Sequence, residues 1–229
     1  MQLYRNFRWG DLASFFVLDT RQYRTDQPCG DRSGPTCDGM LDPDATPLGE
    51  TQKRWLMDGL DRSTTRWNVI PQQIMMARVD RMPGDAELFG MDIWSGYEVA
   101  RRRLMEFLAT RRPANPIVLT GDIHSNWVND LKVDYESENT PVVGTEFVGT
   151  SISSGGDGVD TQDSTAAMLL ENPWVKFFNA QRGYVRCAVT ADQCVADYLV
   201  LDYVTRPGSP ISTRASFVVE NGRPGAQRL

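Results

Sequence analysis

The stretch Pro116–His124, with the sequence PIVLTGDIH, decides the fold expected for this chain. Its first five residues carry no charge, which is typical of a short strand buried on both faces of a sheet. Gly121 then permits a tight turn, so that the strand runs directly into Asp122 and His124. Ligands of α/β proteins bind at the carboxyl ends of such strands, and these two side chains are therefore the first candidates for a functional site.

The segments around this strand alternate in pattern. Strand patterns at residues 15–18 and 67–70 are followed by helix patterns that begin at residue 48 and span residues 97–110. The last third of the chain is expected to hold a short helix near residues 164–170 and strands at residues 145–151, 183–190, 195–204 and 215–220. Alternation of strands and helices followed by antiparallel strands predicts a layered α/β fold. We expect one domain over residues 1–225 and a tail at residues 226–229, with fraying after Glu220.

Composition excludes several functions. The net charge of −6 argues against nucleic acid as a binding partner, and no apolar run is long enough to form a transmembrane segment. His124 is the only histidine of the chain, so any site that needs two histidines within it is excluded. The metal chemistry that is left is the binding of hard cations by oxygen atoms of Asp, Glu, Asn and the backbone.

The four cysteines form no CxxC pair. Cys29 and Cys37 flank a loop rich in Gly and Pro that could bring them within bridging distance, and both a disulfide and two free thiols are open at this point. Pairing of two strands about Asp192 and Gln193 would place Cys194 opposite Ala191, which disfavours a bridge from Cys194 to Cys187.

The cluster after the central strand has a chemical interpretation. Asp122 offers a hard carboxylate as a metal ligand, and Asn126 could add a neutral oxygen ligand. His124 is the candidate catalytic residue, because an imidazole suits proton transfer or metal ligation. Such a set is typical of one wall of a metal-dependent phosphoester hydrolase. The alternative is an Asp that caps a turn beside a histidine whose hydrogen bonds are satisfied by neighbours.

Three other groups of charged side chains also need an interpretation. Arg21, together with Arg24, could clamp a phosphate, or could be ion-paired to Asp19 or Asp26. The loop that begins at residues 155–158 (GGDG), called the glycine loop below, carries Asp157 and Asp160. These two carboxylates could hold calcium but lack the ligand spacing of an EF-hand. The run 101–103, all arginine, is expected to be the solvated face of the helix 97–110.

Six strings of the sequence together resemble the PhoD family of alkaline phosphatases, which are metallophosphoesterases. They occur in the family's order and with its spacing from about residue 5 to residue 225. The strings are Leu18–Arg24, Leu48–Leu56, Asp92–Tyr97, Leu119–His124, Glu146–Ser154 and Arg182–Val185. Each is weakly specific alone, and their common order makes the resemblance strong.

The resemblance implies a layered two-sheet metallophosphoesterase sandwich that hydrolyses phosphate monoesters and diesters. It implies Fe3+ and Ca2+ as cofactors, with Asp122 as a metal ligand and His124 as a catalytic residue. Only Asp122 and His124 carry over from the family pattern, and Arg21 and Asn126 are candidates for binding the phosphate ester from their own chemistry. It also implies an extracellular, periplasmic or cell-wall-associated location for the full-length protein.

One departure from the family pattern changes the expectation. The first metal-binding strings of the family, including a GD-x-Y string and a ligand cysteine, have no counterpart here. We therefore expect the chain to be the carboxyl-terminal half of the catalytic domain, without a complete set of metal ligands and without a signal peptide. Two other functions stay open, a non-catalytic remnant and a calcium-stabilised extracellular binding module.

Overall fold

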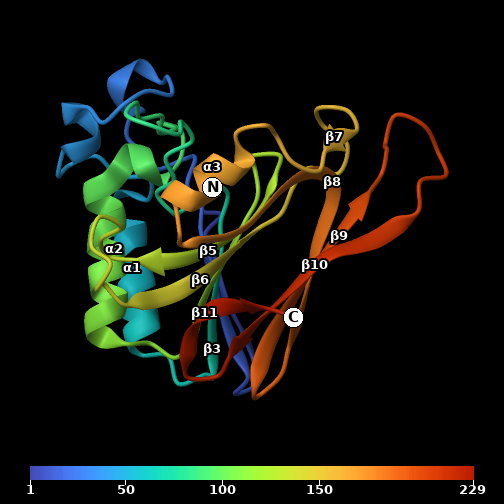
Figure 1. The fold of residues 1–229 in the computed structure, drawn as a ribbon. Coiled ribbons are helices and arrows are strands. Elements are labelled where there is room, and N and C mark those ends of the chain that lie inside the picture. Colours follow the sequence, from blue (N-terminus) through green and yellow to red (C-terminus); the bar gives the residue numbers. More distant parts are fainter.

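The computed structural model describes residues 1–229 and contains three α-helices and eleven strands (Figure 1). The helices are α1 (Gly49–Asp61), α2 (Glu98–Arg111) and α3 (Thr165–Glu171). The strands of the first half are β1 (Arg5–Trp9), β2 (Ala13–Val17), β3 (Trp67–Pro71), β4 (Pro116–Thr120) and β5 (Asn126–Lys132). The others are β6 (Val142–Val148), β7 (Gly158–Val159), β8 (Val175–Val189), β9 (Gln193–Leu201), β10 (Ile211–Glu220) and β11 (Arg223–Arg228).

The strands follow the order β1-β2-β3-β4-β6-β5-β8-β9-β10-β11, and β7 pairs with β8. The neighbours β2, β3, β4 and β6 are parallel, and all other pairs are antiparallel. Parallel neighbours bring their carboxyl ends to one edge of the sheet, so the residues that follow β2, β3 and β4 meet there.

Strand β8 belongs to both halves of the sheet. Its first part pairs with β5, where Asn179 lies opposite Asn126, and its second part pairs with β9 from Arg182 to Val189. Gly183 lies at the change of partner with φ of 155°, and a Cβ there would stand 1.9 Å from the carbonyl oxygen of Leu199. Only glycine fits this close approach, which lets β8 to β11 turn across the first sheet as a second layer (Figure 1).

Two hydrophobic cores separate three layers. One core lies between the helices α1 and α2 and the first sheet, and the other lies between the two sheet layers. The adjacent residues of β4 show the division, because Val118 belongs to the helix side and Ile117 to the core between the sheets. Both side chains are almost fully buried, which confirms the strand expected from the uncharged run.

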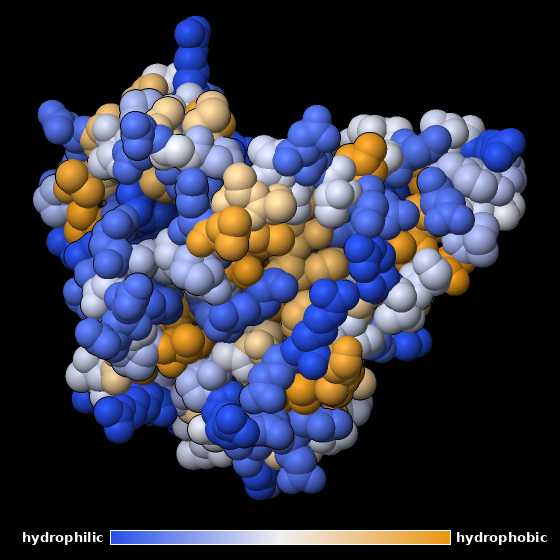
Figure 2. Space-filling model, viewed as in Figure 1, coloured by the Kyte–Doolittle hydropathy of each residue, from blue (hydrophilic) through white to orange (hydrophobic).

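The two cores differ in their side chains. Five of the 14 buried residues of the core between the sheets are aromatic, against five of 25 in the core on the helix side. The five between the sheets are Trp67, Phe147, Phe177, Tyr198 and Phe217. In the view of Figure 2, apolar residues gather at the centre of the face, between the main body and the arm formed by the later strands. No helix is both long and apolar enough to cross a membrane.

The layered α/β fold and the expected helices are confirmed, but two features were missed. Residues 126–132 form β5, a strand that was not expected from the sequence. The expectation of a frayed tail is wrong, because β11 pairs with β10 and Ala226 donates a backbone hydrogen bond to Asp130 Oδ1 at 3.0 Å.

The arginine run of α2 is only partly solvated, and the expectation is wrong for Arg101. Its side chain is 1% exposed and forms an ion pair with Glu98 at 2.7 Å. The same guanidinium donates hydrogen bonds to the carbonyl oxygens of Lys132 and Val133. The burial of this charge is compensated by these acceptors, which join α2 to the loop after β5.

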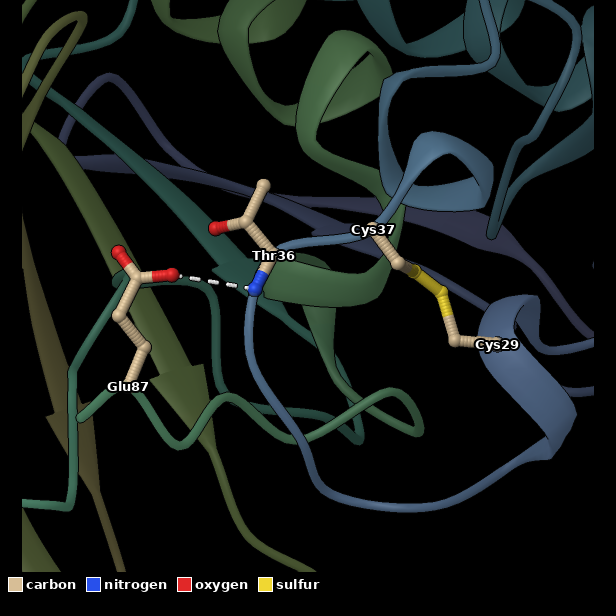
Figure 3. Close-up of a disulfide and its surroundings, with 4 residues drawn as sticks. All are labelled: Cys29, Thr36, Cys37 and Glu87. Carbon is tan, nitrogen blue, oxygen red and sulfur yellow. Dashed lines mark hydrogen bonds between the residues drawn. A yellow bond between two sulfur atoms is a disulfide. The ribbon is translucent and has the colours of Figure 1, made fainter.

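A disulfide joins Cys29 and Cys37 and closes the loop between them (Figure 3). Beside it, the backbone nitrogen of Thr36 donates to the Glu87 carboxylate at 3.1 Å and ties this loop to the segment before α2 (Figure 3). Cys187 and Cys194 are free, as expected, but the predicted register is wrong because Cys194 lies opposite Val189. The turn takes up residues 190–192 and so shifts the pairing.

Candidate active site at the end of β4

The loop that follows β4 holds two non-glycine residues in the left-handed region. Asp122 has φ of 67° and His124 has φ of 58°, and both side chains are exposed. Two backbone hydrogen bonds shape this turn, one from the Gly121 nitrogen to the carbonyl oxygen of Gln73 and one from Ile123 to Gly121. Backbone strain of this kind is concentrated at functional sites, so the loop 121–125 is the first candidate for one.

Asp122 belongs to a cluster of arginines and carboxylates whose members come from distant parts of the chain. Arg21, which follows β2, donates to Asp122 and to Asp92, with N–O distances of 2.6 Å in each case. Arg24 and Gln27 also donate to Asp92. The arginine therefore holds the Asp122 carboxylate in place from one side, with Asp92 as its second anchor.

The electrostatics of this cluster favour ionised groups. Burial alone would raise the pKa of Asp92, but hydrogen bonds from Arg21, Arg24 and Gln27 lower it below the ordinary value. For Arg21, burial acts to lower the pKa, and the two carboxylates outweigh it and raise the pKa. The expectation that Arg21 is ion-paired is confirmed, but the partners Asp19 and Asp26 are wrong.

His124 is held through its backbone. The carbonyl oxygen of His124 accepts a hydrogen bond of 2.6 Å from Nη1 of Arg182, which is buried at the start of the second part of β8. The guanidinium of Arg182 also donates to Ser151 Oγ and to the carbonyl oxygen of Gly156, each at 3.0 Å. Arg182 thus fixes the strained loop to two segments that lie far from it in the sequence.

A buried carboxylate, that of Glu146, is hydrogen-bonded to the carboxyl end of β4. Glu146 of β6 accepts hydrogen bonds from the backbone nitrogens of Met76 and Ala77, from Thr120 Oγ1 at 2.7 Å and from Asn129 Nδ2 at 3.0 Å. Its burial raises its pKa, and the four donors oppose that effect. This residue was not recognised as a support from the sequence, although a glutamate within a run of buried strand residues is a signal for such a role.

Asn126 lies at the start of β5 and is fully buried. Its Oδ1 accepts a hydrogen bond from the backbone nitrogen of Thr150, and its Nδ2 donates to Asn179 Oδ1, both at 3.0 Å. These contacts join β5 to β8 and to the loop after β6. They give Asn126 a structural role, and its binding of substrate stays a prediction.

The acidic residues of the glycine loop are engaged elsewhere. Asp157 accepts hydrogen bonds from the backbone nitrogens of Val204 and Thr205, and Asp160 forms an ion pair of 2.6 Å with Arg214. Their carboxylates therefore pin the loop to the arm of β9 and β10. This arrangement lends no support to a calcium-stabilised binding module.

The residues of this chain do not by themselves fit the iron and calcium ions that the resemblance implies. No group of three or more His, Cys, Asp or Glu side chains could hold a metal ion. Asp122 and His124 are the candidate donors at the loop, and the carboxylate of Asp122 is ion-paired with Arg21. Two donors are fewer than the three or four protein ligands that metal sites commonly use.

Comparison with known proteins gives one consistent result. The family model described as PhoD-like phosphatase matches residues 1–198. Alkaline phosphatase D of Bacillus subtilis (strain 168) is 47% identical over 229 residues, which are 100% of this chain and 39% of that protein. A solved structure described as "Structure of PhoD" has a TM-score of 0.96 and 47% identity, and the match covers 100% of this chain and 44% of that chain. The chain spans about two fifths of the length of the curated relative, and it belongs to the PhoD-like phosphatase family.

Proposed function

We propose that this chain takes part in the metal-dependent hydrolysis of phosphate monoesters and diesters, as an alkaline phosphatase of the D type. The observation that carries the proposal is the loop 121–125, where Asp122 and His124 share a strained conformation at the carboxyl end of a parallel strand. Membership of the family supports a phosphate ester as the substrate class.

His124 is proposed to contact the phosphate or to protonate the leaving group. In hydrolysis, the oxygen of a water molecule forms a bond to phosphorus while the ester P–O bond breaks. The ester oxygen leaves with a proton from His124, and the proton released by the water restores the imidazolium through solvent. Its exposed position suits such a proton transfer, because the imidazole can reach a leaving group at the loop.

Arg21 is proposed to bind the phosphate of the substrate. Its planar guanidinium offers several donors, and two of its nitrogens already bind carboxylates at 2.6 Å. A phosphate that approaches the loop 121–125 would take over one of these donors, most simply the one that faces Asp122.

Iron and calcium ions are proposed as cofactors of the complete protein on the basis of the resemblance. Within this chain Asp122 is the proposed ligand, and no group of three or more possible ligand side chains surrounds it. We propose that the remaining ligands come from outside residues 1–229, consistent with a match to 39% of the Bacillus subtilis relative.

An extracellular or cell-envelope location is also proposed. The disulfide between Cys29 and Cys37 supports it, because disulfides persist mainly in oxidising compartments.

The test is a chimera in which this chain replaces the matching segment of the Bacillus subtilis relative. Release of p-nitrophenol from p-nitrophenyl phosphate and from its bis ester is followed with iron and calcium present. The chimera should be active, and Asp122→Asn and His124→Ala should each lower kcat by about a hundredfold or more. Asp11→Asn is the matched control, since the side chain of Asp11 is 96% exposed and pairs only with Arg8.

Near-normal turnover of the Asp122→Asn chimera would contradict the role of this carboxylate as a ligand. A chimera that folds but hydrolyses neither ester would favour the non-catalytic remnant. The chain of 229 residues alone, assayed in parallel, shows how much of the activity depends on the rest of the protein.

A further inference from the structure

A separate cavity of about 240 Å3 adjoins the loop of the candidate active site. Ile123 and His124 line it, whereas Asp122 does not, so the loop 121–125 stands between the cavity and the charge cluster of Arg21. The other walls come from β8, from the segment 162–168 and from Arg81. The cavity is thus placed to receive a group that is joined to the phosphate ester held at the loop.

The lining of this cavity carries positive charge only. Arg81 and Arg182 line it together with His124, and no aspartate or glutamate does. This contrasts with the whole chain, in which 30 acidic residues outnumber 24 basic ones. A concave site with charge of one sign and partly apolar walls concentrates the opposite charge in a ligand.

The positive charge of Arg81 is not paired with any carboxylate. Its Nη2 donates to Ser33 Oγ at 2.9 Å, but its Nε is buried without any hydrogen-bond partner. Burial lowers the pKa of this guanidinium, and no carboxylate opposes that effect. The guanidinium of Arg81 therefore lines the cavity with one neutral hydrogen-bond acceptor and no acid, which leaves its charge free to be neutralised by an anionic ligand.

Arg182 adds a second charge that no acid neutralises. It is 7% exposed, and its partners are the neutral oxygens of His124, Gly156, Thr150 and Ser151. Hydrogen bonds to neutral oxygens hold the guanidinium in place and leave its charge to act on the cavity.

The remaining walls suit the carbon skeleton of a ligand. Trp127, Phe178 and Met168 present apolar surface, and Gln162, Ser164 and Thr165 add neutral polar groups. Ligand sites are commonly apolar cavities in which a few polar groups fix the orientation.

We propose that this cavity binds a second anionic group of the substrate, a phosphate or a carboxylate, on the molecule whose phosphate ester is cleaved at the loop 121–125. The inference rests on the proposed function and narrows the substrate class to phosphate esters that carry another negative charge nearby. Arg81 is the specificity-determining residue, since its guanidinium lines the cavity and its only side-chain partner is the neutral hydroxyl of Ser33.

Binding to the chain of 229 residues tests the cavity without any hydrolysis. Isothermal titration calorimetry at constant ionic strength compares propane-1,3-diyl bisphosphate with propyl phosphate and with inorganic phosphate. The bisphosphate should bind about tenfold more tightly than propyl phosphate, because only the bisphosphate can hold one phosphate at the loop 121–125 and the other beside Arg81 at the same time. Arg81→Gln should remove most of this advantage, and Arg81→Lys should keep part of it because the charge is retained.

The matched control is Arg223→Gln, since the side chain of Arg223, on β11, is 68% exposed and forms its ion pair with Glu220 of β10. It should bind all three probes as the unaltered chain does. Thermal unfolding of each variant checks that it is folded. Equal binding of the bisphosphate to the Arg81→Gln and unaltered chains would overturn the proposal.

Kinetics of the chimera separate a substrate group from a free anion. Phosphate release should show a higher kcat/KM for the bisphosphate than for propyl phosphate. Arg81→Gln should lower the ratio of these two kcat/KM values about tenfold, mainly by raising the KM of the bisphosphate. If Arg81→Gln weakens the binding of inorganic phosphate but leaves the ratio unchanged, the cavity holds a free anion and the substrate inference is wrong. Another outcome is an inactive chimera while calorimetry shows that the chain prefers the bisphosphate only when Arg81 is present. In that case the proposed function is wrong and the anion-binding site is supported.

Discussion

Replacing Arg182 by Met should loosen the loop of the candidate active site more than any change to the neighbouring surface of β8. The substitution keeps an unbranched side chain of similar length but removes the guanidinium. That group donates hydrogen bonds to the carbonyl oxygen of His124 at 2.6 Å, to Ser151 Oγ and Gly156 O at 3.0 Å, and to Thr150 Oγ1 at 3.3 Å.

The magnitude follows from these contacts. A hydrogen bond from a charged donor contributes about 1.5–3 kcal/mol, and the two hydroxyl groups can turn toward water or other acceptors in the adjoining cavity. The carbonyl oxygens of His124 and Gly156 are then the main losses, so Arg182→Met should lower the free energy of unfolding by about 2–4 kcal/mol. Arg182→Lys keeps one donor for His124 and should recover about half of that loss.

Urea unfolding at neutral pH measures these differences in the chain of 229 residues. Arg186→Met is the matched control on the same strand, because the side chain of Arg186 is 61% exposed and its ion pair with Asp197 lies at the surface. This control should change the free energy of unfolding by less than about 1 kcal/mol. The amide resonances of residues 121–125 should shift in Arg182→Met and stay in place in Arg186→Met.

Equal stability of Arg182→Met and Arg186→Met, with unchanged resonances of the loop, would refute the reasoning. It would mean that the backbone of Asp122 and His124 keeps its left-handed conformation without the guanidinium. In the active chimera, Arg182→Met should lower kcat more than it raises KM, with partial rescue by Arg182→Lys, because it acts through the position of His124.

Two further predictions concern the bend of the sheet and the charge cluster. Gly183→Ala should lower the free energy of unfolding by about 3 kcal/mol or more in urea titrations, because a Cβ at φ of 155° would stand 1.9 Å from Leu199 O. The control is Gly222→Ala, which carries only the strain of its φ of 79° because no atom lies within 4 Å of its Cβ, and equal losses would contradict the close approach. The lowered pKa of Asp92 gives stability that is present above the ordinary aspartate range near pH 4 and is lost as the pH falls through the lowered value. The unfolding midpoint of the unaltered chain should therefore drop more steeply between about pH 4 and pH 2 than that of Asp92→Asn, and parallel curves would contradict the ion pairs.

The sequence predicted the candidate site only in part. Asp122 and His124 were found because a strand pattern ended directly before them, and local patterns of this kind are visible without a structure. Arg21 was recognised as a charged group that needs a partner, but its partners lie 71 and 101 residues away. No spacing rule connects positions at such separations, so the wrong neighbours, Asp19 and Asp26, were chosen.

Arg81 was missed for a related reason. Nothing around it in the sequence distinguishes it from a surface arginine, and its importance depends on the absence of an acid near its folded position. Arg182 was noticed only as part of a family string. Both arginines lie on segments that meet beside the loop 121–125, where they line one cavity. This shared position could be predicted only once the order of the strands in the sheet is known.

The sequence by itself determined the layered α/β class, the strand that presents Asp122 and the positions of the helices, because these follow from hydrophobic periodicity and turn residues over short windows. The tertiary structure alone decided that β8 serves both sheet layers and that Arg21 holds Asp122. It also decided that Arg182 holds the backbone of His124. Arg21 and Asp122 lie 101 positions apart, and His124 and Arg182 lie 58 apart. The free energies of such contacts depend on burial and on the geometry of donors and acceptors that only the folded chain brings together.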